Sequence, residues 1–308
     1  MQKTNNPLHC DPETGFCEIP EKSAFSSAPE KTTGAAKPVR VVYFTDPICS
    51  SCWGVEPSWR KLKATYGHIL SIEYRMGGLL PDWSYDSGGI SQPSDVAHHW
   101  DEVSIRYEMP IDGDVWLEDP LDSSYPPSIA FKAAQIQDEQ KAVAFLRRIR
   151  EMVFLEKKNI SKPEHLMAAA NQVGLNPEAL SQDMEGKARE LFYQDLAVAK
   201  EYGVRGFPTF FFMDAAGNQA KVYGTKPYEV FETTLLTVYP SAFKKTYEKD
   251  WESLFSLHYS YTAKEFAAIG DMSKTDSEIR LQVLHEQGHL EKVSTKNGDL
   301  WVIKNGKP

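Results

Sequence analysis

The sequence predicts an α/β fold in which a small sheet is interrupted by a long helical insertion. An apolar strand at residues 39–44 runs into a Cys-x-x-Cys motif and then into a helical pattern. A second, phenylalanine-rich strand follows Pro208, and about a hundred residues with helical periodicity lie between the two halves. A strand and helix unit that is split in this way is typical of an α/β domain with an inserted α domain.

The first strand leads directly to a pair of cysteines. Its apolar residues are Val39, Val41, Val42, Tyr43 and Phe44. Asp46 and Pro47 end the strand, and Cys49 and Cys52 follow before a segment with helical apolar spacing. A cysteine at the start of a helix faces unpaired N–H groups and the positive end of the helix dipole, which favour a thiolate. The second cysteine, one turn later, is close enough to resolve a mixed disulfide.

Two other interpretations of this motif are weaker. A zinc site needs two further ligands, and the remaining cysteines, Cys10 and Cys17, are spaced too widely for a second zinc knuckle. Two ordinary core cysteines are disfavoured because the pair lies at a turn beside Ser50 and Ser51. The order strand, Cys-x-x-Cys, helix therefore favours a redox site, whose attacking sulfur must be within reach of a partner.

A second motif precedes the phenylalanine-rich strand. Phe207, Pro208 and Thr209 follow the segment Gly203–Gly206 and lead into the strand Pro208–Met213. Proline is tolerated only at the start or edge of a strand, and X-Pro bonds in such tight places are the ones found in the cis form. We therefore expect a cis bond at Pro208.

Both motifs resemble the signatures of DsbA-type thioredoxin-fold proteins. The matching stretches are FTDPICSSCW at 44–53 and GVRGFPTFFF at 203–212. Segments 114–137 and 154–161 are similar to the cytoplasmic branch with a large helical insertion, which includes FrnE-like oxidoreductases and the SpxH (YjbH) adaptors of the ClpXP protease. The resemblance covers roughly residues 39–239. It implies a thioredoxin-like mixed sheet, with its second and fourth strands outside the first and third.

The resemblance also implies roles for individual residues. Cys49 would be the nucleophile and Cys52 the resolving thiol. Pro208, with Phe207 and Thr209 beside it, would dock an extended partner chain opposite the cysteines. The resemblance implies no cofactor and no metal at this site.

Composition limits the kind of partner. The chain has 308 residues and a net charge of −9, which gives little electrostatic support for nucleic-acid or anionic-membrane binding. No apolar run is long enough to span a membrane, and the first residues lack the apolar core of a secretory signal. We therefore expect a cytoplasmic protein, in which paired thiols are catalytic, sensing or metal-bound.

The chain divides into four predicted parts. Residues 1–38 are poor in apolar residues and read as a flexible lead-in. Residues 39–93 and 203–239 form the thioredoxin-like domain, with further strands at Ile69–Met76 and Gln219–Tyr223 and a last helix at Pro227–Tyr239. Residues 94–202 form the inserted helical domain, whose first helix we expect to be capped by Ser94 or Asp95. Residues 240–308 form a C-terminal module.

Cys10 and Cys17 in the lead-in leave three possibilities open. They could form a disulfide or redox pair that serves the Cys-x-x-Cys motif. With His9 they could form part of a metal site that lacks a ligand. They could also be unpaired thiols in a flexible tail.

Several charged residues have a plain structural interpretation. The adjacent His98 and His99 point about 100° apart on a helix and chelate weakly. The basic run Arg147, Arg148 and Arg150 predicts the solvated face of an amphipathic helix, with a docking patch for an acidic partner as the alternative. Asp46 and Glu56 are expected at a strand end and on a surface helix; in the alternative they oppose the thiolate or relay its proton. The dipeptide Ser50-Ser51 brings no positive charge to the cysteines.

For the C-terminal module the sequence predicts three helices, two strands and a turn. The helical stretches are 247–257, 262–269 and 274–287, and Asn297-Gly298 lies between two short apolar runs. This order resembles a small winged-helix unit. Its third helix carries mixed charges, which favours contact with protein over contact with DNA.

Two functions follow as hypotheses. The first is a thiol–disulfide oxidoreductase or isomerase that acts on protein disulfides through Cys49 and Cys52. The second is a non-enzymatic adaptor that hands a transcription regulator to the ClpXP protease, with the cysteines as a redox sensor. A glutathione-linked isomerase is disfavoured, because such enzymes on this fold usually work with a single Ser or Cys.

Overall fold

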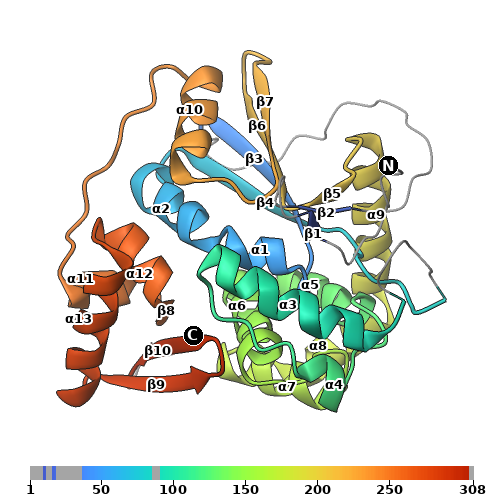
Figure 1. The fold of residues 1–308 in the computed structure, drawn as a ribbon. Helices are drawn as coiled ribbons and strands as arrows, with labels where there is room; N and C mark the ends of the chain where they lie inside the picture. Colours follow the sequence, from blue (N-terminus) through green and yellow to red (C-terminus); the bar gives the residue numbers. More distant parts are fainter. Residues whose placement is uncertain (1–9, 12–15, 19–36, 85–90, 305–308) are drawn as a thin grey trace, which may run out of the picture.

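The computed structural model describes residues 10–11, 16–18, 37–84 and 91–304 (Figure 1). A four-stranded sheet lies at the centre, in the order β4 (Leu70–Met76), β3 (Val39–Thr45), β6 (Thr209–Asp214) and β7 (Gln219–Tyr223). β3 pairs parallel with β4 and antiparallel with β6. This is the mixed thioredoxin-like sheet that the sequence analysis expected, and the prediction of its strand order is confirmed.

Aromatic residues fill both faces of this sheet. On one face Tyr43 stacks on Phe210 with 4.1 Å between ring centroids. Trp59 of α2 (Glu56–Tyr66) and Phe231 of α10 (Tyr228–Val238) cover that pair. On the other face Phe44 contacts Tyr202, at the end of α9. β3 is therefore buried on both sides, which explains its uninterrupted apolar sequence.

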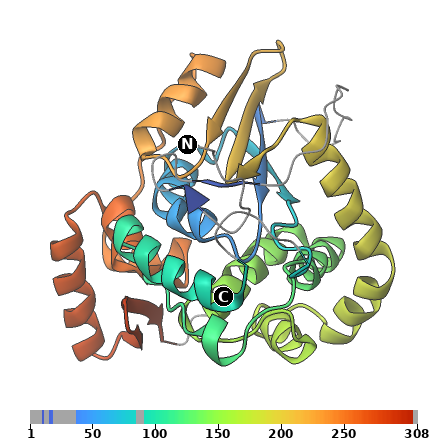
Figure 2. The same ribbon diagram turned by 45° about the vertical axis from the view of Figure 1, so that its right-hand side comes forward.

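The insertion between β4 and β6 is helical. Its elements are α3 (Pro93–Tyr107), α4 (Val115–Glu118), α5 (Tyr125–Gln137), α6 (Glu139–Leu155), α7 (Pro163–Gln172), α8 (Pro177–Glu185) and α9 (Lys187–Glu201). The expected caps of the first helix are corrected: Gln92 is the N-cap, and Asp95 is its partner in a capping box. The short α4 was not predicted, because it lies in a segment rich in proline and acidic residues. Figures 1 and 2 show α3 to α8 packed at one end of the sheet, with α9 running along its side.

The C-terminal residues add a second, smaller sheet. They form α11 (Trp251–Leu257), β8 (Ser260–Thr262), α12 (Ala263–Gly270), α13 (Lys274–Glu286), β9 (Leu290–Thr295) and β10 (Gly298–Ile303). The strand order is β8-β10-β9, and a cluster that includes Phe255, Tyr261, Phe266 and Trp301 forms its core. β8 was not predicted, because three residues between two helices carry too short a pattern. The likeness to a winged-helix unit stays a prediction.

Two short strands precede the central sheet. β1 (Cys10–Asp11) pairs antiparallel with β2 (Phe16–Glu18), and β2 pairs antiparallel with β5 (Gly206–Phe207). These five residues belong to the segment that the sequence predicted to be a flexible lead-in. They are ordered by backbone pairing with a strand that lies far away in the sequence, which composition cannot reveal. The helices that the structure describes include none long and apolar enough to cross a membrane.

Candidate functional site

Cys49 and Cys52 lie at the turn between β3 and the short helix α1 (Ser50–Gly54). Cys49 is the N-cap of α1, and its Sγ accepts a hydrogen bond from the backbone N–H of Cys52 at 3.2 Å. The two cysteines are in the reduced form, and each side chain is 0% exposed. The motif thus has the local geometry of a redox site, but its sulfurs are closed off from solvent in this conformation.

The loop before β6 faces these sulfurs. The Phe207–Pro208 peptide bond is cis, and the Cys49 Sγ lies 3.8 Å from the carbonyl oxygen of Phe207. The hydroxyl of Thr209 donates to the carbonyl of Gly206 at 2.7 Å and ties β5 to the start of β6. The five residues that the sequence singled out, Cys49, Cys52, Phe207, Pro208 and Thr209, therefore come together in one place, and their roles in binding or catalysis stay a proposal.

Close packing fixes the position of Phe207. Its ring lies against Gly77, at the end of β4, so tightly that a Cβ on that glycine would come within 1.7 Å of the Phe207 Cζ. Only glycine leaves room for the ring at this point. The carbonyl that faces Cys49 is thus held by a buried aromatic side chain as well as by the strand.

The helical insertion covers the other side of the motif. The Tyr107 hydroxyl, at the end of α3, lies 2.8 Å from the Ser51 hydroxyl, and the Thr225 hydroxyl donates to the Ser51 carbonyl at 2.9 Å. The Tyr107 ring packs on Gly54, where an added Cβ would lie 2.5 Å from the ring. Tyr107 and Thr225 therefore hold the turn of the motif from two directions.

A buried cation lies close to the cysteines. Arg150 of α6 is 1% exposed; its guanidinium donates to the Glu56 carboxylate at 3.0 Å, to the Thr45 hydroxyl at 2.5 Å and to the Asp46 carbonyl at 3.3 Å. The dipeptide Ser50-Ser51 itself brings no positive charge, but Arg150 supplies one from outside the motif. The charge comes from a helix about a hundred residues away in the sequence.

Burial and the charge of Arg150 shift the pKa values of the two cysteine thiols in opposite directions. Burial raises the pKa of the Cys49 thiol, and Cys52 and the Asp46 carboxyl group raise it further. Burial also acts to raise the pKa of Cys52, but the hydrogen bond from Cys49 and the charge of Arg150 bring it below its ordinary value. In this closed arrangement the thiolate is therefore favoured on Cys52, whereas the helix N-terminus alone predicted it on Cys49.

The two acidic residues beside the motif are both buried. Asp46 accepts hydrogen bonds from the backbone N–H groups of Ile48 and Leu79 and from the Ser124 hydroxyl, at 2.8–3.0 Å. Burial raises its pKa to about 6. Glu56 is 8% exposed and pairs with Arg150, so its expected place on a surface helix is corrected. Asp46 holds the loop between β3 and β4 and opposes a thiolate on Cys49.

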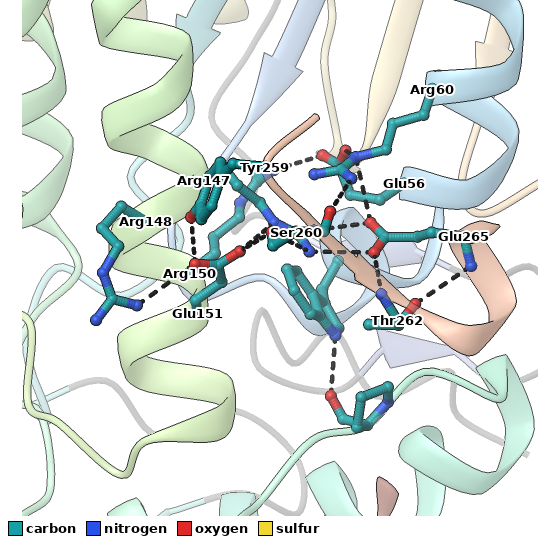
Figure 3. A network of polar contacts seen from close by, with 12 residues as sticks. Glu56, Arg60, Arg147, Arg148, Arg150, Glu151, Tyr259, Ser260, Thr262 and Glu265 are labelled. Atoms are coloured by element: carbon teal, nitrogen blue, oxygen red, sulfur yellow. Dashed lines mark hydrogen bonds and ion pairs between the residues drawn. The ribbon is translucent and has the colours of Figure 1, made fainter. Parts of the chain in front are cut away.

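The prediction that α6 has a solvated basic face was also wrong. Arg147, Arg148 and Arg150 are 8%, 9% and 1% exposed and enter a buried ion network (Figure 3). Arg147 contacts Glu265 of α12 at 2.7 Å and Glu151 at 2.7 Å. These charges are paired inside the molecule and leave no basic patch for an acidic partner on this helix.

The ion network joins three parts of the chain. Arg60 of α2 contacts Glu56 at 3.4 Å and Glu265 at 3.3 Å, and it donates to the Ser260 carbonyl of β8 at 2.9 Å. The series Cys52, Arg150, Glu56, Arg60 and Glu265 thus runs from the motif to the C-terminal residues. Buried pairs of this kind fix the relative position of packed elements more than they add stability.

The remaining candidates do not form a site. His98 is exposed and pairs with Glu102, while His99 is buried. Across the part of the chain that the structure describes, no three His, Cys, Asp or Glu side chains are placed to hold a metal ion. His9 lies outside the described residues.

Sequence reasoning missed Tyr107, Thr225 and Arg150. For Arg150 a signal existed, because it lies between Leu146 and Phe154, four residues before and after it, on an apolar face of α6 that must be buried. No pattern in the sequence indicates that Tyr107 and Thr225 meet at Ser51.

Comparisons with known proteins agree with this geometry. The family model described as thioredoxin matches residues 43–233. The chain is 33% identical to the ClpXP adapter protein SpxH of Halalkalibacterium halodurans over 307 residues, 98% of this chain and 99% of that one. It is 29% identical to the ClpXP adapter protein SpxH of Bacillus subtilis, over 86% of this chain and 89% of that one.

Solved structures match a smaller part of the chain. A putative protein disulfide isomerase from Nitrosomonas europaea matches with a TM-score of 0.56 and 19% identity, over 65% of this chain and 97% of that one. The cytosolic disulfide reductase DsbM from Pseudomonas aeruginosa matches with a TM-score of 0.52 and 23% identity, over 64% of this chain and 98% of that one. At these identities the likeness shows the fold alone.

Proposed function

Because this chain belongs to the thioredoxin-fold family that contains the SpxH proteins, we propose that it is an adapter that delivers a protein to the ClpXP protease in the cytoplasm. The observation that carries the proposal is the extent of the likeness. The SpxH of H. halodurans matches 98% of the chain, including the C-terminal residues, whereas the disulfide isomerase and reductase structures match about two thirds of it.

The closed motif supports an adapter over a constitutive enzyme. A catalyst of protein thiol–disulfide exchange must present its attacking sulfur to another protein, because exchange proceeds through a mixed disulfide. The Cys49 and Cys52 side chains are 0% exposed, and Tyr107 and Thr225 hold the turn between them closed. The cysteines therefore suit a sensor that reports oxidation.

The ion network gives such a sensor a physical connection to the C-terminal residues. Arg150 contacts the region of Cys52 and also Glu56, which pairs with Arg60 beside Ser260 of β8. A disulfide between Cys49 and Cys52 removes the charge that Arg150 faces. We expect this change to alter the balance of the network and hence the contact between α2, α6 and β8.

The test is a reconstituted degradation assay. ClpX, ClpP, ATP and an Spx-type transcription regulator from the same organism are mixed with and without the full chain. The proposal expects the chain to accelerate ATP-dependent loss of the regulator but not of an unrelated ClpXP substrate, which is the control. An unchanged rate, with the chain shown to be folded, would contradict the adapter function.

A second candidate function is thiol–disulfide oxidoreductase activity. The observation that favours it is the 3.8 Å contact between the Cys49 sulfur and the carbonyl that precedes the cis bond at Pro208. In this reading Cys49 attacks, Cys52 resolves, and residues 207–209 dock the partner. Turbidity during insulin reduction tests it: activity that is lost in Cys49→Ser supports the enzyme, and equal low activity in wild type, Cys49→Ser and Cys52→Ser excludes it.

A further inference from the structure

Three backbone positions near the motif lie in register across three strands. Cys10 of β1 is the cross-strand partner of Cys17 in β2, and Cys17 is the cross-strand partner of Phe207 in β5. Phe207 is the residue whose carbonyl oxygen lies 3.8 Å from the Cys49 sulfur. The backbone pairing thus places Cys10 beside Cys17, and Cys17 beside the residue whose carbonyl faces the Cys-x-x-Cys motif.

The spacing of paired strands suits disulfide chemistry along this line. Direct cross-strand partners in an antiparallel pair have Cα atoms about 4.5–5.5 Å apart. Disulfides join residues whose Cα atoms are about 4.4–6.8 Å apart. Cys10 and Cys17 meet this condition by register, and Cys17 occupies the strand that lies alongside the residue before Pro208.

We propose that the N-terminal hairpin is an internal substrate of the motif, and that a disulfide passes between Cys49–Cys52 and Cys10–Cys17 by exchange within one chain. β2 occupies the strand edge that an extended partner would use, so the hairpin and an external chain compete for β5. The inference rests on the redox-sensor role proposed for Cys49 and Cys52, and it names Cys10 and Cys17 as the pair that receives the disulfide.

The exchange balances without any external reagent. The Cys17 thiolate attacks the Cys49 sulfur of the Cys49–Cys52 disulfide, a Cys17–Cys49 bond forms, and Cys52 leaves as a thiolate. The Cys10 thiolate then attacks the Cys17 sulfur, a Cys10–Cys17 bond forms, and Cys49 leaves as a thiolate. The motif is reduced by two electrons and the hairpin is oxidised by two, while two protons pass from the hairpin thiols to the motif thiols.

The surroundings of the motif favour this internal route. Arg150 stabilises Cys52 as a thiolate, and a leaving group with a lower pKa departs faster. Cys49 is 0% exposed, which excludes large external partners in this conformation. A tether of this kind keeps the hairpin cysteines at an effective concentration on the order of millimolar, well above that of a dilute partner.

The test traps the mixed disulfide in the full chain. The double variant Cys10→Ser, Cys52→Ser lacks both thiols that could resolve the mixed disulfide, so mild oxidation with diamide should leave a Cys17–Cys49 bond. Digestion after Glu13 separates Cys10 from Cys17, and mass spectrometry without reduction identifies the joined peptides. We expect the yield of Cys17–Cys49 to exceed by about tenfold that of Cys10–Cys49 in the double variant Cys17→Ser, Cys52→Ser, and to be unchanged by about tenfold dilution. The bond should disappear in the double variant Cys17→Ser, Cys52→Ser.

A second variant tests the last exchange step separately from the first. Cys10→Ser blocks the last step while Cys52 can still resolve the mixed disulfide, so oxidation should end with Cys49–Cys52, whereas the wild type should end with Cys10–Cys17. Equal yields of Cys10–Cys49 and Cys17–Cys49 would overturn the proposal, because a loose tail would give them. It would also be overturned if Cys49 were found only with glutathione, or if Cys10 and Cys17 held a metal ion and stayed reduced. No protease or regulator is present, so these results are separate from those of the degradation assay.

Discussion

The sulfur of Cys49 lies 3.8 Å from the carbonyl oxygen of Phe207, although 158 residues separate the two in the sequence. The insertion that separates them also covers the site, through Tyr107 at the end of α3 and Arg150 in α6. The helical insertion therefore packs against the turn of the motif and supplies the positive charge beside Cys52. The predictions below test each of these effects.

Tyr107 is predicted to limit the reactivity of the motif. Tyr107→Ala removes the ring on Gly54 and the 2.8 Å contact with Ser51, so Cys49 should be alkylated faster. Tyr107→Phe keeps the ring and loses only one hydrogen bond, worth about 1 kcal/mol, so its alkylation should be faster by about fivefold at most. The rate is measured by mass spectrometry with iodoacetamide under native conditions. Equal rates in wild type and Tyr107→Ala would show that something else closes the motif.

Arg150 is predicted to set the charge on Cys52. Without its guanidinium, the pKa of the Cys52 thiol should rise, because burial then acts without the compensating charge. The measurement is the pH dependence of Cys52 alkylation in Arg150→Met. Arg148→Met is the matched control, since Arg148 lies on the same helix and pairs with Glu151 and Glu156. A Cys52 pKa that responds equally to both changes would contradict a specific role for Arg150.

Asp46 is predicted to make stability depend on pH. Burial raises its pKa to about 6 from an ordinary value of 3.8, so the folded protein binds the proton more tightly than the unfolded chain. Its contribution is most favourable at low pH and is lost as pH rises through about 6, a change of about 3 kcal/mol at most. The free energy of unfolding of Asp46→Asn, which carries no titrating proton at this position, should therefore rise relative to that of wild type between about pH 4 and 6.5. Parallel pH profiles for the two proteins would be the contrary result.

The link between α6 and the C-terminal residues is predicted to depend on Glu265. Glu265→Gln removes one of the two buried carboxylates that each of Arg147 and Arg60 contacts, and should lower the free energy of unfolding by about 3 kcal/mol. Lys274→Ala breaks an exposed pair with Glu278 and should cost about 0.5 kcal/mol or less. Denaturant unfolding measures both. A small effect for Glu265→Gln would mean that the network does not hold the C-terminal residues in place.

The sequence predicted the parts of the site that local patterns describe. The strand before Cys49, the turn at the motif and the strand after Pro208 each have a pattern of their own, and the resemblance supplied their order in the sheet. Arg150 was misplaced because a run of charged residues was assigned to solvent, although Arg150 shares an apolar face of α6 with Leu146 and Phe154. Strands β1 and β2 could not be predicted, because two or three residues form a strand only when a distant partner such as Phe207 pairs with them.

The central claim is that the cysteines sense oxidation in an adapter whose delivery does not need them. The most direct measurement compares wild type with the double variant Cys49→Ser, Cys52→Ser in the ClpXP degradation assay, before and after treatment with diamide. The account predicts equal acceleration by both proteins under reducing conditions, and a change on oxidation in wild type alone. A double variant that is inactive under reducing conditions would contradict it, because the sulfurs would then be part of delivery itself.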